Sequence, residues 1–88
     1  VLFVNLGAAE QMASMQIIRT LRDAGIAAEI YPEAAKMKKQ MEYANRRMIP
    51  YVVIIGSNEL AERRATVKNM RTGEQQSVEF EAVASALA

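Results

Sequence analysis

The chain has 88 residues, 51% apolar and 24% charged, which suits one globular domain with a single core, and no apolar run approaches the ~20 residues that span a membrane. It contains no cysteine and no histidine, which excludes disulfides, zinc–thiolate sites, histidine metal ligands and Ser-His-Asp triads, and we expect no metal site in it. The net charge is only +1, but residues 36–71 hold nine basic and three acidic residues, and this asymmetry predicts an anionic partner on one side of the molecule.

The first part of the chain alternates predicted strands and helices. Residues 1–6 are an apolar run of β-forming residues, and residues 8–24 have a helical composition that closes at Gly25. A core-facing stripe recurs at helical spacing in this helix, through Ala13, Ile17, Leu21 and Ala24. A second short strand is predicted for residues 26–31.

The middle of the chain contains a second helix and a buried strand. The helix is predicted for residues 34–48, before Pro50. Its core-facing side carries Met37, Met41, Ala44 and Met48. The apolar run at residues 51–56 is typical of a fully buried strand, and residues 57–63 then form one helical turn or a tight connection.

The last part of the chain is predicted to be a hairpin followed by a short helix. Strands at residues 65–70 and 75–80 flank a glycine-containing turn at residues 71–74, and the closing helix follows. The order β-α-β-α-β-β-β-α contains two right-handed βαβ units. It therefore predicts a parallel core extended by a hairpin at one edge, with helices on both faces.

Basic residues and one tyrosine gather on one side of the second predicted helix. At about 100° per residue they fall in an outward-facing sector opposite the methionines. The members of this sector are Lys36, Lys39, Tyr43, Arg46 and Arg47. Cations on such a face can meet phosphates while the aromatic ring stacks on an unpaired base, which indicates a nucleic-acid surface. A solvated helix face with a half-buried tyrosine explains the same pattern, so both interpretations stay open.

The predicted strand at residues 65–70 carries a second basic group. Side chains alternate along it, so that Arg64, Thr66 and Lys68 share one side, opposite Ala65, Val67 and Asn69. A basic strand face fits an anionic ligand. Lysine and arginine on an exposed edge strand also prevent edge-to-edge pairing of sheets, and this explanation fits equally well.

Two polar residues lie at the ends of predicted buried strands. Glu59 comes just after residues 51–56, at the strand end where open α/β sheets bind ligands. Its carboxylate can accept hydrogen bonds from a base edge such as guanine N1–H and N2–H₂, or it can stabilise the N-terminus of a helix whose predicted N-cap is Ser57 or Asn58. Asn5, at the end of the first predicted strand, can likewise cap a helix or read a base.

Met12 and Met15 lie on the side of the first predicted helix that faces away from the core stripe. Exposed methionines occur at protein interfaces, and they also fill gaps at domain edges. The first explanation motivates an alternative function for the chain, as a protein-interaction or dimerisation module.

A series of short motifs runs through the second half of the chain in a fixed order. They are Lys38-Lys39-Gln40, Tyr43-Ala44, the strand from Ile49 to Gly56, Glu59, Val67-Lys68 and the hairpin from Thr72 to Gln75. In their combined spacing the chain resembles the anticodon-binding domain of class II aminoacyl-tRNA synthetases, and most closely that of the histidyl enzymes. The resemblance covers nearly the whole chain. One departure is Met48, where the family often has glycine.

The resemblance implies a single three-layer α/β/α domain, residues 1–88, with a mixed five-stranded sheet in the order 2-1-3-4-5 and an antiparallel fourth strand. It also implies that the carboxyl-end edge of this sheet grips a tRNA anticodon, whose bases are read by Asn5, Glu59 and Lys68. Further residues expected to contact the anticodon or its phosphates are Lys36, Lys39, Gln40, Tyr43, Arg46, Arg47 and Arg71. Tyr43 would either stack on a base or pack within the domain.

The resemblance places catalysis in a separate domain that binds ATP, Mg²⁺ and histidine, and no cofactor is expected in this chain. Because the chain opens on a strand pattern without an initiator methionine, we expect it to be a domain cut from a longer protein. That protein would be a cytoplasmic, homodimeric synthetase of the histidyl type, not bound to a membrane, with this domain packed on its catalytic domain. Threonyl, prolyl and glycyl enzymes share the fold and stay open as alternatives.

Overall fold

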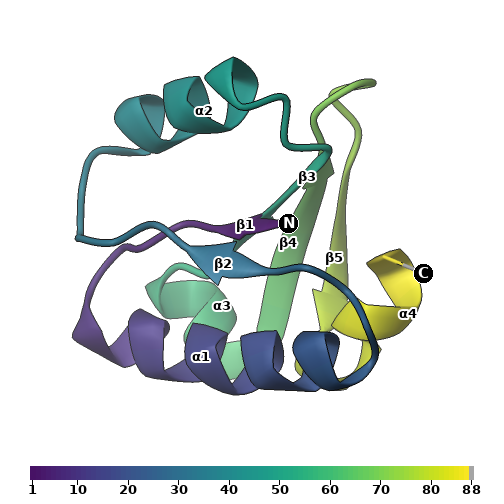
Figure 1. Ribbon diagram of the computed structural model, residues 1–88. Coiled ribbons are helices and arrows are strands. Elements are labelled where there is room, and N and C mark those ends of the chain that lie inside the picture. Colours follow the sequence, from purple (N-terminus) through teal and green to yellow (C-terminus); the bar gives the residue numbers. More distant parts are fainter. Residues whose placement is uncertain (88) are drawn as a thin grey trace.

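The structure is a computed structural model that describes residues 1–87. Its strands form one mixed sheet in the order β2-β1-β3-β4-β5, in which β1 is parallel to β2 and β3, and β4 is antiparallel to β3 and β5 (Figure 1). The strands are β1 (Leu2–Phe3), β2 (Glu29–Ile30), β3 (Tyr51–Ile54), β4 (Arg64–Asn69) and β5 (Gln75–Glu79). The predicted sheet order and the antiparallel fourth strand are confirmed.

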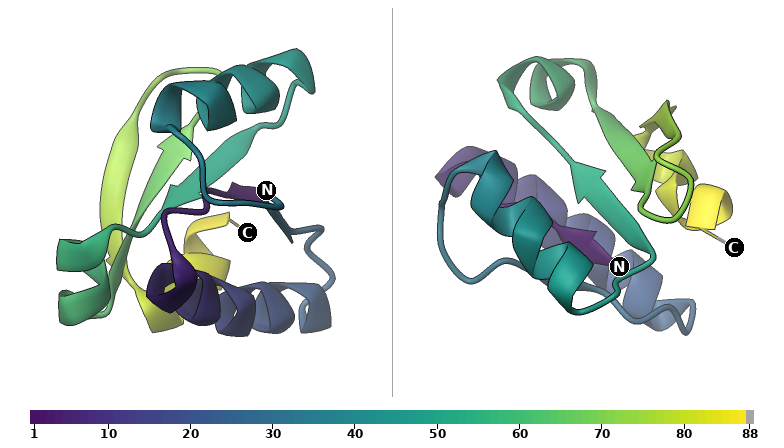
Figure 2. Two further views of the ribbon diagram at one scale, coloured as in Figure 1. Left: turned by 90° about the vertical axis from the view of Figure 1, so that its left-hand side faces the viewer. Right: turned by 90° about the horizontal axis from the view of Figure 1, so that it is seen from above.

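Helices lie on both faces of this sheet. They are α1 (Ala8–Asp23), α2 (Met37–Arg46), α3 (Ser57–Glu62) and α4 (Val83–Leu87), with a short 3-10 helix, η1 (Phe80–Ala82), before α4. α1 and α4 lie on one face, and α2 lies on the other (Figures 1 and 2). Within the described part of the chain, every helix is too short or too polar to cross a membrane.

Alternating side chains of the central strands fill two apolar layers. Leu2 and Val52 belong to the layer under α2, whereas Phe3 and Val53 belong to the layer against α1 and α4. The buried residues of the α1 layer are Phe3, Ile17, Ile18, Leu21, Ala28, Val53, Ile55, Ala65, Val67 and Val83. Those of the α2 layer are Leu2, Val4, Tyr31, Ala44 and Val52. The α2 layer is thus the thinner one, and α2 supplies it with one fully buried apolar side chain.

α1 ends at Asp23, one residue before Ala24, the last member of its predicted stripe. Gly25 has a left-handed backbone (φ 82°), which turns the chain away from the helix axis. Ala24 is consequently exposed and is not part of the buried side, whereas Ile17 and Leu21 are buried as predicted. The buried side of α1 also includes Ser14 and Ile18.

α2 is shorter at both ends than the predicted helix of residues 34–48. It ends at Arg46, and the chain turns away from the helix axis at a left-handed Met48 (φ 55°), where the N–H groups of Met48 and Ile49 donate to carbonyl oxygens of Asn45 and Ala44 at 3.1 and 3.0 Å. The prediction that Met48 faces the core is therefore wrong, because this turn directs its side chain outward. Met48 is 87% exposed.

Candidate nucleic-acid interface

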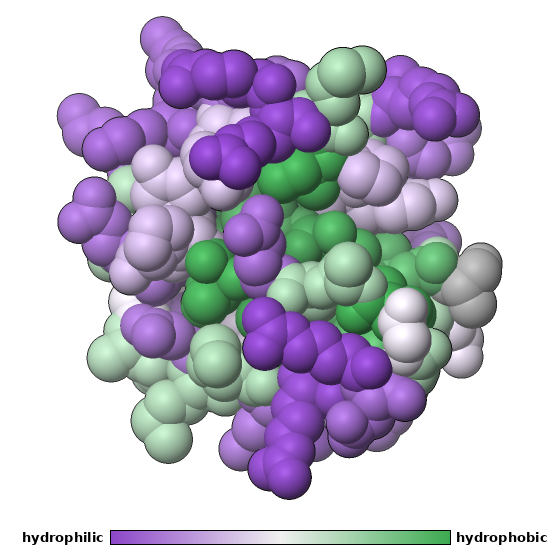
Figure 3. Space-filling view, viewed as in Figure 1, coloured by the Kyte–Doolittle hydropathy of each residue, from purple (hydrophilic) through white to green (hydrophobic). Residues whose placement is uncertain are grey.

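The cations of α2 form an exposed surface, which we call the α2 cation surface. It consists of Lys36, Lys38, Lys39, Arg46 and Arg47, all of which are exposed. The buried residues of the helix are Gln40 and Ala44, with Met37 and Met41 half-buried beside them. Hydrophilic residues gather over this helix at the top of the molecule, above an apolar area in the middle of the same face (Figure 3).

Tyr43 packs within the domain. Its ring meets the ring of Tyr31 edge-on, with centroids 5.3 Å apart and an interplanar angle of 87°. The guanidinium of Arg47 lies over the Tyr43 ring, 4.9 Å from its centroid. Since Tyr31 directly follows β2, this part of α2 faces the β2 side of the sheet. The ring is half-buried and one of its faces is covered by Arg47, so packing is the arrangement that the structure shows.

Asn5 and Gln40 are buried and bonded to each other at the carboxyl end of β1. Gln40 is fully buried, its Oε1 accepts a hydrogen bond from the Asn5 backbone N–H at 2.6 Å, and its Nε2 donates to the Asn5 backbone oxygen at 2.9 Å. The Asn5 side chain is 2% exposed, donates to Tyr31 O at 3.1 Å and accepts from Gly7 N–H at 3.3 Å. In this arrangement neither side chain presents a free hydrogen-bonding group to solvent. Base reading by Asn5 stays a prediction.

Glu59 is half-buried in the first turn of α3. Its Oε1 accepts a hydrogen bond from the Gly56 backbone N–H at 3.1 Å, which satisfies one of the unpaired donors at the helix start. The N-cap is Gly56, and not Ser57 or Asn58 as predicted, because Ser57 is already the first helical residue. The helix-stabilising role of Glu59 is therefore present in the structure, on the same side chain that was predicted to read a base.

β4 presents a polar side to the α2 face of the sheet. Ala65 and Val67 are buried on the opposite face, whereas Arg64, Thr66 and Lys68 are half-buried. The cross-strand partners of these three residues on β5 are Glu79, Ser77 and Gln75. α2 does not extend over β4 and β5, so it leaves this part of the face uncovered (Figure 2).

The position of β4 in the sheet shows that one of the two explanations for its basic residues, protection of an edge strand, is wrong. β4 pairs with both β3 and β5, so protection of an edge strand is not their role. Arg64 is tied locally, because its Nε and Nη2 donate to Ser77 Oγ and Ser77 O, both at 2.9 Å. Ser77 and Gln75 were not predicted as part of the site. The glycine-containing turn could have revealed them in the sequence. Counting residues outward from this turn pairs Lys68 with Gln75 and Thr66 with Ser77.

Arg71 lies in the turn between β4 and β5, next to the end of α2. The backbone N–H groups of Arg71 and Thr72 donate to Asn69 Oδ1 at 2.9 and 3.2 Å, which shapes the turn. A groove of about 240 Å³ separates this turn from the last turn of α2. It is lined by Ala44, Asn45, Met48, Ile49, Pro50, Met70 and Arg71.

Arg63, in contrast, is engaged away from the open face. It has a left-handed backbone (φ 53°) after α3, and its Nη2 donates to Glu81 Oε1 at 2.9 Å. This hydrogen bond holds the pKa of Glu81 below its ordinary value. The guanidinium also lies 5.4 Å from the centroid of the Phe80 ring. Its charge therefore contributes little to an RNA-binding surface.

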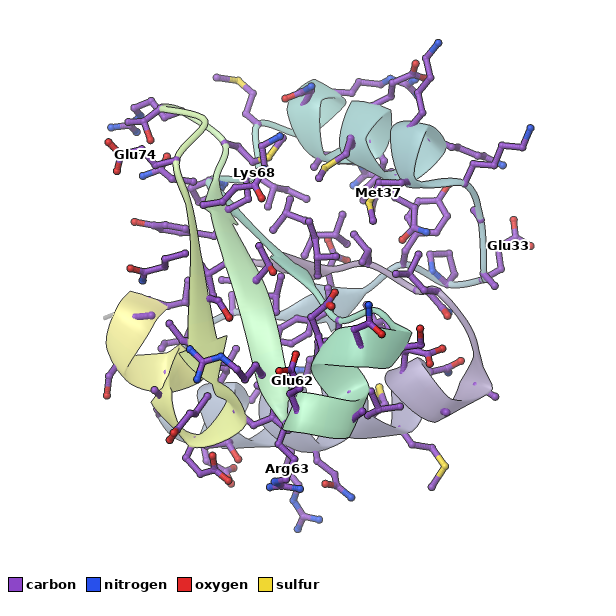
Figure 4. The ribbon with its side chains drawn as sticks, turned by 180° about the vertical axis from the view of Figure 1, so that it is seen from behind. Glu33, Met37, Glu62, Arg63, Lys68 and Glu74 are labelled. Carbon is purple, nitrogen blue, oxygen red and sulfur yellow. The ribbon has the colours of Figure 1, made fainter. Side chains whose placement is uncertain are left out.

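The predicted site residues fall at two ends of the sheet. Asn5, Gln40 and Glu59 lie at the carboxyl ends of β1 and β3, whereas Lys68 pairs with Val52 near the start of β3. Figure 4 shows Lys68 at the end of β4 near the turn that carries Glu74, with Glu62 and Arg63 at the opposite end. Val52 and the Gly56 bonded by Glu59 are four residues apart along β3, or about 13 Å at ~3.3 Å per residue.

α2 runs between the two ends of the sheet at which the predicted site residues lie. Gln40 fixes its first half at the carboxyl end of β1, and a short connection after Arg47 leads to Tyr51 at the start of β3. The structure thus brings Lys36 and Lys39 toward the end that holds Glu59, and Arg46, Arg47 and Arg71 toward the end that holds Lys68. Among residues 1–87, no three acidic, histidine or cysteine residues are grouped as a metal site would need.

Comparisons with known proteins agree with this fold. The family model described as "Anticodon binding domain" matches residues 1–88. The histidine–tRNA ligase of Bacteroides fragilis (strain YCH46) is 55% identical over 86 residues, 98% of this chain and 19% of the ligase. That of Christiangramia forsetii is 45% identical over 87 residues, 99% of this chain and 19% of the ligase. The chain therefore spans about a fifth of the length of these relatives.

Solved structures of histidyl-tRNA synthetases contain a domain with the same fold. The crystal structure of histidyl-tRNA synthetase from Nostoc sp. PCC 7120 superimposes with a TM-score of 0.91 at 27% identity, over 98% of this chain and 20% of that one. The apo S. aureus histidyl-tRNA synthetase gives a TM-score of 0.86 at 31% identity, over 99% of this chain and 26% of that one. The match of the family model to the whole chain, on a sheet of the expected order, shows that the chain belongs to the anticodon-binding domain family.

Proposed function

We propose that this chain is the anticodon-binding module of a histidine–tRNA ligase, which positions and selects tRNA(His) for aminoacylation by a separate catalytic domain. The observation that carries the proposal is that the family match covers the whole chain and that similar relatives are histidine–tRNA ligases. In those relatives the matched segment is 19% of the length. The remaining length leaves room for the catalytic domain.

The distribution of charge supports RNA as the ligand. The α2 cation surface and Arg71 can neutralise phosphates, while the open polar face of β4 and β5 offers side chains that can hydrogen-bond to bases. In this proposal Lys36, Lys39, Arg46, Arg47 and Arg71 hold phosphates. Glu59 reads a base at the carboxyl end of β3, and Lys68 contacts another nucleotide at the opposite end of β4.

Asn5, Gln40 and Tyr43 take part differently in the proposed site. For Asn5 to read a base, its side chain must give up the hydrogen bonds to Tyr31 O and Gly7 N–H. Gln40 is fully buried, so its contribution to RNA binding is indirect. Tyr43 supports the surface by packing against Tyr31 and holding Arg47.

The parent enzyme supplies the chemistry. Because the chain covers only 19% of the histidine–tRNA ligases that it matches, we assign ATP, Mg²⁺ and histidine to a separate catalytic domain and no reaction step to this chain. We propose that the parent is a homodimer in the cytoplasm and that this domain packs on the catalytic domain. Its contribution to aminoacylation is the placement and selection of tRNA.

A titration tests the proposed function. The 88-residue chain is titrated with a labelled RNA stem-loop that carries the tRNA(His) anticodon arm, and with the same stem-loop after one anticodon base is changed, at two salt concentrations. We expect salt-dependent binding of both RNAs, because phosphate contacts release counterions, and tighter binding of the cognate one. Equal affinities would contradict anticodon selection.

One observation favours a second candidate function, a protein-interaction or dimerisation module. Met12 and Met15, on the outer side of α1, are 70% and 45% exposed. Exposed methionines suit an adaptable protein interface. If the chain binds neither stem-loop at low salt but self-associates in sedimentation experiments, this second function is supported instead.

A further inference from the structure

Gln40 pairs with the backbone of Asn5, two residues beyond the end of β1, where the strand pairing of β1 with β2 and β3 has ended. β1 still contacts β3 at Val4, whose N–H donates to Val53 O at 3.0 Å, and the next residue is Asn5. The Gln40 side chain pairs with both the N–H and the C=O of Asn5, at 2.6 and 2.9 Å, as an adjacent strand would do. Its Nε2 also donates to Ala35 O at 2.9 Å, just before α2 begins.

These hydrogen bonds are the directional polar contact between α2 and the end of β1. The other contacts of the helix are made by buried Ala44, by half-buried Met37 and Met41, and by Tyr43, whose ring meets that of Tyr31 edge-on. Methionine side chains are flexible and adapt to many packing arrangements, so they hold a helix in place without defining its direction. Two hydrogen bonds to the N–H and C=O of one residue permit a much narrower range of helix directions.

The same network reaches the other segments at this edge of the sheet. The Asn5 side chain donates to Tyr31 O, after β2, and accepts from Gly7 N–H, before α1. Gln40 therefore fastens α2 to a point that is itself tied to the end of β2 and the start of α1. All buried side-chain nitrogen and oxygen atoms of the described residues have hydrogen-bond partners, so this network is fully satisfied.

We propose that Gln40 is a positioning residue for RNA recognition. It sets the direction of α2, and thereby the place of the α2 cation surface relative to Glu59. The inference rests on the proposed function, because the RNA is the ligand whose phosphates and bases must meet these two groups together. Gln40 itself touches no RNA, since it is fully buried.

Two substitutions of Gln40 test this role in the 88-residue chain. Gln40→Met keeps the length of the side chain and loses both pairings with Asn5, whereas Gln40→Glu keeps the acceptor for Asn5 N–H and loses the donor. The matched control is Val83→Ala, a fully buried position in the opposite apolar layer, which lowers stability without touching α2. Unfolding curves first establish the temperature at which every variant is folded.

At that temperature we expect Gln40→Met to weaken binding of the cognate stem-loop by about 5- to 10-fold, the low end of what loss of one base contact gives in DNA readers. Val83→Ala should bind like the wild-type chain. Unchanged affinity of Gln40→Met, or an equal loss in Val83→Ala, would overturn the inference. If Gln40→Met does not fold, Gln40→Glu carries the same comparison.

A second measurement needs no RNA. Residual dipolar couplings report the direction of the α2 N–H vectors relative to the sheet, and we expect them to change in Gln40→Met and to stay unchanged in Val83→Ala. Unchanged α2 vectors in Gln40→Met would refute the positioning role even where RNA binds. If the wild-type chain binds no RNA, the proposed function fails, while the couplings still decide whether Gln40 orients α2.

Discussion

Glu59 combines a structural contact and a proposed recognition role in one carboxylate. Its Oε1 accepts the Gly56 N–H, and a Cβ added at Gly56 would lie 2.9 Å from that oxygen, so the two residues form a close-fitting turn into α3. A carboxylate repels phosphate and attracts donor groups, which suits it to a base edge. The two roles respond differently to substitution and can be separated.

We expect Glu59→Ala to lower the free energy of unfolding by about 1 kcal/mol, since the hydrogen bond to Gly56 is lost. It should also reduce the preference for the cognate stem-loop over one with a changed anticodon, by the ~1–3 kcal/mol of a good base contact. Glu59→Gln is the control, because it can keep the bond to Gly56 but not the charge. A cognate-to-changed ratio that survives in both variants would leave Glu59 with a structural role alone.

Met48 is a strained residue whose strain can be relieved. It adopts φ 55° at the position after α2 where glycine is favoured, and its side chain is 87% exposed. Met48→Gly should raise the free energy of unfolding by about 0.5–1 kcal/mol, because relief of the left-handed backbone exceeds the entropy that glycine adds to the unfolded chain. Chemical denaturation measures the change.

Gly25 provides the matched control at the end of α1. It has φ 82°, and nothing lies within 4 Å of a Cβ built there, so Gly25→Ala should destabilise the chain through backbone conformation alone. We therefore expect the free energy of unfolding to rise in Met48→Gly and to fall in Gly25→Ala, if left-handed backbone conformation is the cause of both changes. A loss of stability in Met48→Gly would show that the Met48 side chain makes a contact that outweighs the strain.

At the scale of elements, the sequence predicts the order of strands and helices because apolar runs, glycine stops and turn residues are local signals. The burial of Asn5 and Gln40 is not predictable in this way, since the bonds between them join residues 35 positions apart. The end of α2 was missed because Met48 replaces the usual glycine signal. Helical spacing did place the cations of α2 on an exposed surface, and the structure agrees.

The α2 cation surface should contribute affinity without selectivity. We expect Lys39→Ala to weaken cognate and changed stem-loops by the same factor and to reduce the slope of log K against log salt by about 0.7, the value for one phosphate contact on a single strand. Arg19→Ala, exposed on α1 and outside the proposed interface, serves as the control and should change neither quantity. A shift in the cognate-to-changed ratio for Lys39→Ala would indicate a base contact.

At the scale of the whole molecule, the proposed interface is long because its groups lie at both ends of the central strand. Glu59 bonds to Gly56 at the carboxyl end of β3, and Lys68 pairs with Val52 near the start of β3; these two backbone positions are about 13 Å apart along the strand at ~3.3 Å per residue. Glu59 and Lys68 are close in the sequence, but the rest of α3 and most of β4 lie between them. Their sequence separation therefore does not reveal that they lie at opposite ends of β3. Two residues so far apart suit different nucleotides of one loop.

Additivity of substitutions tests this arrangement. Because side chains more than ~7–10 Å apart act independently, the effects of Glu59→Ala and Lys68→Ala on the free energy of stem-loop binding should add within about 0.5 kcal/mol. The control pair is Lys68→Ala with Gln75→Ala, which face each other across β4 and β5 and are expected to be coupled. A full double-mutant cycle measures both interaction energies. A larger coupling for Glu59 and Lys68 than for the control pair would mean that both residues contact the same nucleotide, and the RNA would then have to lie across the sheet rather than along it.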